Sequence, residues 1–109
     1  MLQPILGSEN IERVLVFIFA RNEGYATEIA HFFETDLFGI QNQLDKLENG
    51  GVVVSHLAGR TRLYTFNPRY PFLKELKSLL NKALTYYPAD VREKLLMNRR
   101  RPRRRGKPL

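Results

Sequence analysis

The stretch that decides the fold is EIAHFFETDLFGIQNQLDKLENGGVV, which spans residues 28–53. Its second half predicts a helix that begins after the N-cap Asp36 and ends at Gly50-Gly51. A shorter helix around residues 27–33 precedes it, and Glu34-Thr35 separates the two. The spacing of three, four and three predicts a buried stripe on the longer helix, at Leu37, Ile40, Leu44 and Leu47. Two short helices joined by a tight turn indicate a helix-turn-helix unit.

A further helix is expected upstream, after a loose lead-in over Met1–Gly7. Ser8 or Asn10 can cap its start, and Gly24 is suited to a left-handed cap at its end. Residues 14–20 are wholly apolar, which predicts a central helix or one at a subunit interface. Its buried stripe is predicted at Ile11, Val14, Leu15 and Ile18.

Downstream, residues 52–57 and 63–66 are expected to form a two-stranded hairpin, because residues 58–62 supply the glycine that a tight turn needs. A long helix over about residues 72–87 follows Pro71. Its heptad-like spacing predicts a dimerisation seam of Leu73, Leu76, Leu80, Ala83 and Tyr87. Residues 90–97 are expected to add one or two helical turns.

The order of these pieces is that of a winged helix-turn-helix: mainly α, with a small β-hairpin wing and a long C-terminal helix. The segment from Glu28-Ile29-Ala30 through Ile40, Leu44 and Leu47 to Gly51-Val52-Val53 resembles winged-helix transcriptional regulators of the ArsR and MarR type. Gly59-Arg60 and Tyr64 are similar to the wing of such proteins. The resemblance covers about residues 8–87. It implies a DNA-binding regulator whose second helix lies in the major groove.

On that reading, four side chains of the longer helix lie opposite its buried stripe, and the first three are the expected DNA contacts: Phe38, Gln41, Asn42 and Asp45. Amides can bond adenine in the major groove, and an aromatic ring can contact a thymine methyl. Gly39 weakens the helix, and one use for it is close approach to a phosphate. Arg60 and Arg62 lie two residues apart in the wing, so they share a side if the second strand already includes both. The alternatives without DNA contact are a solvated face for the helix residues and a polar hairpin tip for the two arginines.

Charge is distributed unevenly along the chain. The net charge is +7, from 18 basic and 11 acidic residues. Residues 99–109 hold seven basic side chains and no acidic one, so the remainder is neutral. The helix-turn-helix, over residues 23–51, has six acids and one base. Because DNA binding normally needs positive charge, the wing and the tail are expected to supply it. The tail arginines are Arg99, Arg100, Arg101, Arg103, Arg104 and Arg105.

Enzymatic and metal chemistry find no support in the residues. Cysteine is absent, which removes thiolate chemistry and the cysteine metal box of ArsR-type sensors. His31 and His56 fall on different expected elements, and no phosphate-binding glycine motif follows a strand. We expect no catalytic residue, no metal and no cofactor. The longest apolar run has seven residues, from Val14 to Ala20, against the roughly 20 that a membrane span needs. A cytoplasmic protein without a membrane partner is expected.

The prediction is one winged-helix domain over residues 1–97, followed by a disordered basic tail over residues 98–109. The expected function is sequence-specific binding of double-stranded DNA by a homodimeric transcriptional regulator. The tail is expected to lie along the DNA backbone, although RNA binding or a merely solubilising role is the alternative. A second class stays open, an adaptor that docks on protein through its acidic face or through Phe32, Phe33 and Phe38. No motif specifies an operator or a small-molecule effector.

Overall fold

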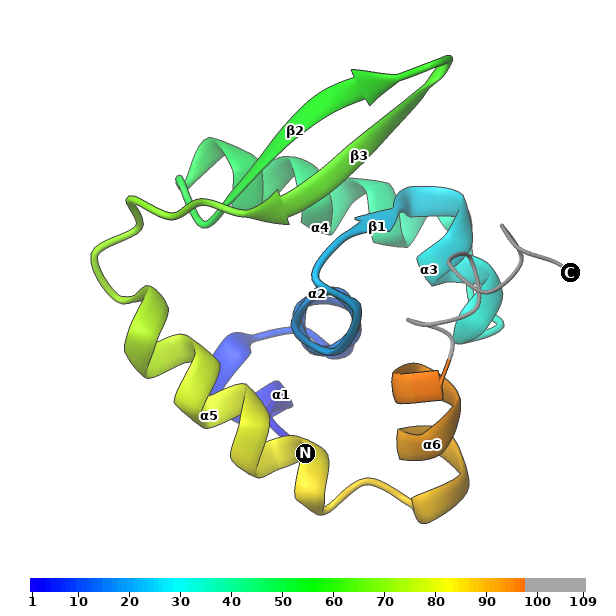
Figure 1. Cartoon of the computed structure of the whole chain (residues 1–109), viewed down its shortest axis with the longest axis vertical. Coiled ribbons are helices and arrows are strands. Elements are labelled where there is room, and N and C mark those ends of the chain that lie inside the picture. The colour runs from blue at the N-terminus through cyan, green and yellow to red at the C-terminus, as the bar shows by residue number, and fades with distance from the viewer. Residues whose placement is uncertain (98–109) are drawn as a thin grey trace, which may run out of the picture.

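The computed structural model describes residues 1–97 (Figure 1). Six helices and three strands occur in this part of the chain. The expected disordered tail, residues 98–109, lies outside it. In chain order the elements are α1 (Gln3–Leu6), α2 (Glu9–Arg21), β1 (Gly24–Tyr25), α3 (Ala26–Phe32), α4 (Leu37–Asn49), β2 (Val53–Ala58), β3 (Thr61–Phe66), α5 (Leu73–Thr85) and α6 (Ala89–Met97). The mainly helical fold with a hairpin wing is that of a winged helix, as predicted. None of the helices described is long and apolar enough to cross a membrane.

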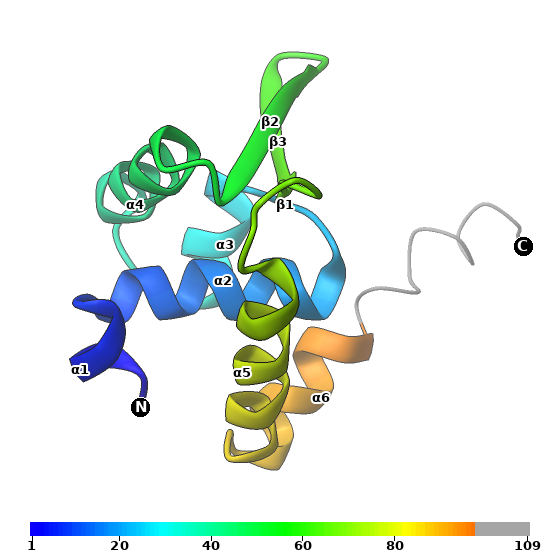
Figure 2. The ribbon, with the colours of Figure 1, turned by 90° about the vertical axis from the view of Figure 1, so that its left-hand side faces the viewer.

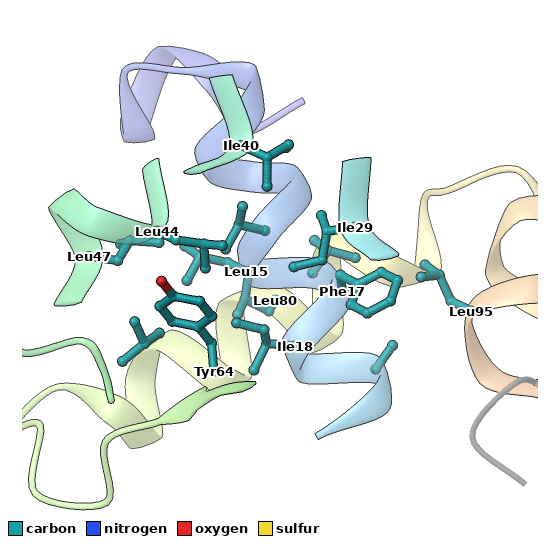
Figure 3. Close-up of a cluster of buried hydrophobic side chains, with 14 of the residues drawn as sticks. Leu15, Phe17, Ile18, Ile29, Ile40, Leu44, Leu47, Tyr64, Leu80 and Leu95 are labelled. Atoms are coloured by element: carbon teal, nitrogen blue, oxygen red, sulfur yellow. The ribbon is translucent and has the colours of Figure 1, made fainter. Parts of the chain in front are cut away.

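Helix α2 runs through the middle of the molecule, with α3 and α4 on one side and α5 and α6 on the other (Figure 2). Ser8 caps its start by accepting hydrogen bonds from two backbone amides. Its apolar run is buried all round, because Val14, Val16, Phe17 and Ile18 are all 0% exposed. Figure 3 shows Leu15, Phe17 and Ile18 of α2 meeting side chains of α3, α4, β3 and α5 in one core. The central position predicted for this helix is therefore confirmed.

The sheet contains a strand that the sequence did not reveal. Strand β1 pairs antiparallel with β3, which gives the order β1-β3-β2. Gly24 belongs to β1 and is not the helix cap, which was a wrong prediction. Asn22 takes the left-handed position instead, with φ 73°. Gly24 is needed for packing, because a Cβ there would lie 3.0 Å from the Phe17 ring.

The expected loose lead-in is also wrong, because residues 3–6 form the short helix α1. Leu2 is buried, and its backbone N–H donates to Glu12 Oε1 over 2.7 Å. Tyr87 donates its hydroxyl to Glu12 Oε2 over 2.6 Å. Burial raises the pKa of Glu12, but hydrogen bonds from Tyr87 and Leu2 and the N-terminal ammonium, 3.3 Å from Oε1, together leave the pKa below its ordinary value. Burial and the neighbouring carboxylate raise the pKa of Tyr87.

Helix α6 is fastened to the core by Arg21. The guanidinium donates to the carbonyl oxygens of Leu95 and Lys94, over 3.2 and 3.3 Å, and its carbon lies 4.4 Å from the centroid of the Phe17 ring. Burial lowers the pKa of Arg21, and the charge of Glu28 opposes that shift. One side chain of α2 thus holds α3 and α6 together, at the point where the chain leaves the described residues.

Candidate nucleic-acid interface

Helix α4 presents one clean outward face. Asp36 caps its first turn by accepting from the Gly39 N–H over 3.1 Å. Ile40, Leu44 and Leu47 point into the core, as predicted. Leu37 was predicted to join them and does not, because it is 44% exposed and lines a surface groove with Thr27 and Tyr64. The outward face holds Phe38, which is 70% exposed, together with Asn42, Asp45 and Asn49.

Gln41 is not on that open face. Its side-chain amide donates to Asp45 Oδ1 and to the hydroxyl of Tyr64, both over 3.1 Å. Both amide hydrogens are thus engaged, and Tyr64 itself is only 2% exposed. To bond a base through its amide, Gln41 must first release one of these partners, whereas Asn42 is free to do so.

Gly39 lies beside the Asn10 side chain of α2. A Cβ at this position would lie 2.8 Å from the side-chain nitrogen of Asn10, closer than real Cβ contacts come. Because this nitrogen is the far end of a flexible side chain, Asn10 can move aside to make room for it. The contact does not by itself require glycine at this position, and close approach to a phosphate stays a prediction.

The wing is a regular hairpin in which Val53 pairs with Phe66 and Ala58 with Thr61. Strand β3 begins at Thr61, so Arg60 lies in the turn and Arg62 on the strand. The two arginines therefore do not share the strand geometry that would put them on one side. Both are exposed.

A chain of hydrogen bonds ties the wing to α4. Arg62 Nη1 donates to the Ser55 hydroxyl over 3.1 Å, and Ser55 donates to Glu48 Oε2 over 2.7 Å. A groove of about 190 Å³ lies between α4, the wing and the start of α3. It is lined by Tyr25, Ala26, Thr27, Leu37, Gln41, Thr61, Arg62 and Tyr64. The wing is consequently held at a fixed position beside the outward face of α4.

Most acids of the helix-turn-helix half have structural partners. Glu28 accepts from the Tyr25 N–H over 3.3 Å and pairs with Arg21 over 3.5 Å. Asp36 caps α4, Asp45 holds Gln41, and Glu48 holds the wing, as described above. Glu23 and Glu34 have no such partner among residues 1–97. The acidity of this half is therefore largely structural.

The other predicted positions divide between core and surface. Phe32 and Phe33 are partly buried and pack edge to face, with ring centroids 4.9 Å apart. Phe38 is thus the only fully exposed member of the aromatic group.

Leu80 and Ala83, at 0% and 4% exposure, belong to the core of the single chain. The predicted dimer seam faces that core, because α5 packs on α2. Leu76 and Tyr87 pack partly against it and Leu73 is half-buried. Dimerisation itself stays a prediction.

No described residues form a group of histidine and carboxylate side chains that could hold a metal ion. His31 and His56 are both exposed, on α3 and on β2.

The six tail arginines lie outside the described residues, so their contact with DNA stays a prediction. Sequence reasoning also missed a basic region: residues 52–85 hold six basic side chains and one acidic one, a net charge of +5. The net charge of each segment of residues 1–98, and not only their total, would have revealed this basic region.

The architecture is that of a winged-helix protein, with α3 and α4 as the helix-turn-helix and β2 and β3 as the wing. A solved structure of Lactococcus lactis ZitR, a double mutant in its apo form, is similar. The TM-score is 0.55 at 16% sequence identity, over 86% of this chain and 80% of that one. At this identity the likeness shows the fold, and the ArsR or MarR type stays a prediction. No protein-family model matches the sequence, and no curated protein matches it either.

Proposed function

We propose that the protein binds double-stranded DNA sequence-specifically and regulates transcription as a homodimer. The observation that carries this proposal is the pairing of the open face of α4 with a hairpin that bears two exposed arginines. Asn42 can bond adenine and Phe38 can contact a thymine methyl. Arg60 and Arg62, which form no ion pair with a carboxylate of the described residues, are suited to phosphate oxygens. A dimer is part of the proposal because one half-site carries little specificity.

The test is selection of binding sites from random duplexes by the full-length protein. We expect an enriched motif, arranged as two related half-sites if the protein acts as a dimer. Asn42→Ala protein, selected in parallel, should lose preference at one position of that motif and keep the rest. Sedimentation of the free wild-type chain checks the dimer separately. The absence of any enriched motif would contradict sequence-specific binding.

A protein-docking adaptor is the second candidate, and the exposure of Phe38 favours it. Leu37 and Phe38 form an apolar pair beside the acids Glu34 and Asp36, which suits a basic and apolar peptide as well as a thymine methyl. The two functions differ in how they respond to Phe38→Lys. This substitution adds charge that favours DNA backbone binding and disfavours an apolar or basic partner. Stronger binding to random duplex supports DNA, and no duplex binding by either form supports the adaptor.

A further inference from the structure

We propose that the loop after the wing, residues 67–72, and the first turn of α5 form a clamp for the DNA backbone at the C-terminal end of α4. The contact residues are Arg69 and Lys74. This inference rests on the proposed function, because it assumes a duplex lying against α4. It assigns a second set of phosphate contacts, at the base of the wing and therefore at the opposite end of the hairpin from its tip.

The loop is held against the end of α4 by Asn67. Its backbone N–H donates to the Val52 carbonyl over 2.9 Å, and its side-chain amide donates to the Gly51 carbonyl over 2.9 Å. Its side-chain oxygen accepts from the Arg69 N–H over 3.0 Å. Figure 1 shows the loop at the end of the sheet where α4 gives way to β2. The backbone of Arg69 is thus linked through Asn67 to Gly51, which lies two residues after the last residue of α4.

Positive charge exceeds negative charge in this region, where Glu75 is the one acid beside three bases. Arg69, Lys74 and Lys77 are exposed, and none pairs with a carboxylate of residues 1–97. Lys74 and Lys77 are three residues apart on α5, so they lie on one face of that helix. The Lys77 ammonium lies 5.8 Å from the centroid of the Phe66 ring, at the base of the wing. The basic surface therefore runs from the base of the wing to the loop.

The geometry of a helix in the major groove explains why a duplex would meet this surface. Such a helix contacts base edges mainly through its N-terminal residues. Helix α4 has 13 residues and is therefore about 20 Å long. The major groove is about 12 Å wide. The C-terminal end of α4 then reaches past the bases to a sugar-phosphate strand, where Arg69 and Lys74 would lie.

The test is a salt titration of duplex binding by the full-length chain. Arg69→Gln with Lys74→Gln removes two charges at the clamp. Lys82→Gln with Lys94→Gln removes two exposed charges from the far end of α5 and from α6, and serves as the matched control. Each phosphate contact contributes about 0.9 to the slope of log affinity against log salt. We expect the clamp pair to lower the slope by about 1–2 per chain and the control pair to leave it unchanged.

Directed cleavage locates the contact, because the chain has no cysteine of its own. Arg69→Cys and Lys94→Cys each give one attachment point for an iron chelate that cleaves nearby DNA backbone. Cleavage from position 69 at the edge of the selected site, and none from position 94, is expected. Equal slopes for the two charge pairs with no cleavage from position 69 overturn the clamp alone. Absence of duplex binding by the wild-type chain overturns the proposed function, and the clamp with it. Salt-sensitive self-association that is lost in the clamp pair, without a change in DNA binding, assigns the cluster to a second copy and also overturns the clamp.

Discussion

Residues 1–51 carry eight acidic and three basic side chains, whereas residues 52–85 carry six basic and one acidic. The first region contains the helix-turn-helix, and the second contains the wing and α5. Six acids of the first region cap a helix, hold Gln41 or the wing, pair with an arginine or lie buried, as Glu12 does. Glu23 and Glu34 have no such partner among residues 1–97. The basic side chains of the second region form no ion pair within residues 1–97.

The difference suggests a division of work. In a winged-helix protein that binds DNA, phosphate attraction supplies most of the affinity and base contacts supply the specificity. Here helix α4, whose outward face we propose to read the bases, is acidic, and the hairpin beside it is basic. We infer that the wing, the loop after it and the tail hold the backbone, while α4 reads the bases. Variants that alter each region in turn test this division.

The largest effect is expected from removing the tail charges. A chain ending at residue 98 loses seven basic side chains. If four to six of them engage phosphates, the slope of log affinity against log salt falls by about 4–5 per chain. The preference for a selected site over random duplex should survive. A full-length variant with all seven replaced by glutamine is the control for length. Unchanged slopes in both variants would show that the tail does not engage DNA.

The next largest effect is expected at the base-reading position. Asn42→Ala should weaken binding to the selected site by about 1–3 kcal/mol and leave binding to random duplex unchanged. Asn49→Ala, the same substitution at the last residue of α4, is the matched control. Gln41→Ala should weaken specific binding less than Asn42→Ala, because its amide hydrogens already bond Asp45 and Tyr64. A larger loss for Gln41→Ala would mean that those bonds break when DNA binds.

A stability effect of similar size is expected inside the acidic region. Tyr87→Phe leaves Oε2 of the buried Glu12 without its 2.6 Å partner, and should lower the free energy of unfolding by about 1–3 kcal/mol. Because the folded pKa of Glu12 is below its ordinary value, its charge stabilises the fold above the unfolded pKa, near 4.5. That contribution is lost as the pH falls through the folded pKa.

Denaturant unfolding of wild type and Glu12→Gln between pH 3 and 6 measures this contribution. The stability of the wild-type chain should fall more steeply toward pH 3 than that of the variant. Parallel curves would show that Glu12 has the same pKa in the folded and unfolded chains, and that its burial has no electrostatic role.

The smallest effect is expected from the two acids without a structural partner. Glu23→Gln with Glu34→Gln should raise affinity for random duplex by a few-fold, because it removes repulsion between these carboxylates and the DNA phosphates. Neither carboxylate makes a structural contact that would be lost. The melting temperature should change only by the small amount that is usual for substitutions at exposed positions. The comparison is Asp36→Ala with Glu48→Ala, which removes the acceptor that caps α4 and the acceptor that holds Ser55 of the wing. It should cost stability where the first pair does not.

The sequence predicted the winged-helix order and the inward positions Ile40, Leu44 and Leu47 of α4, because those follow from apolar spacing and helix caps, but it wrongly placed Leu37 among them. It failed where a long-range contact decides. Gly24 enters a strand because Tyr64 lies opposite it, and a Cβ at Gly24 would lie 3.0 Å from the Phe17 ring. Leu80 and Ala83 have the spacing of a dimer seam, yet the same spacing serves a helix that folds onto its own core. Gln41 has the right type and place for base reading, but only the structure shows the Tyr64 hydroxyl that holds it.

The division of work between the two regions is tested most directly by one crossed experiment. Affinity for a selected site and for random duplex is measured against salt for two variants, Arg60→Gln with Arg62→Gln and Phe38→Ala with Asn42→Ala. The wing variant should lower the salt slope by about 1–2 per chain on both duplexes and keep the ratio of the two affinities. The α4 variant should keep the slope and lose most of that ratio. A wing variant that loses the ratio, or an α4 variant that lowers the slope, would contradict the account.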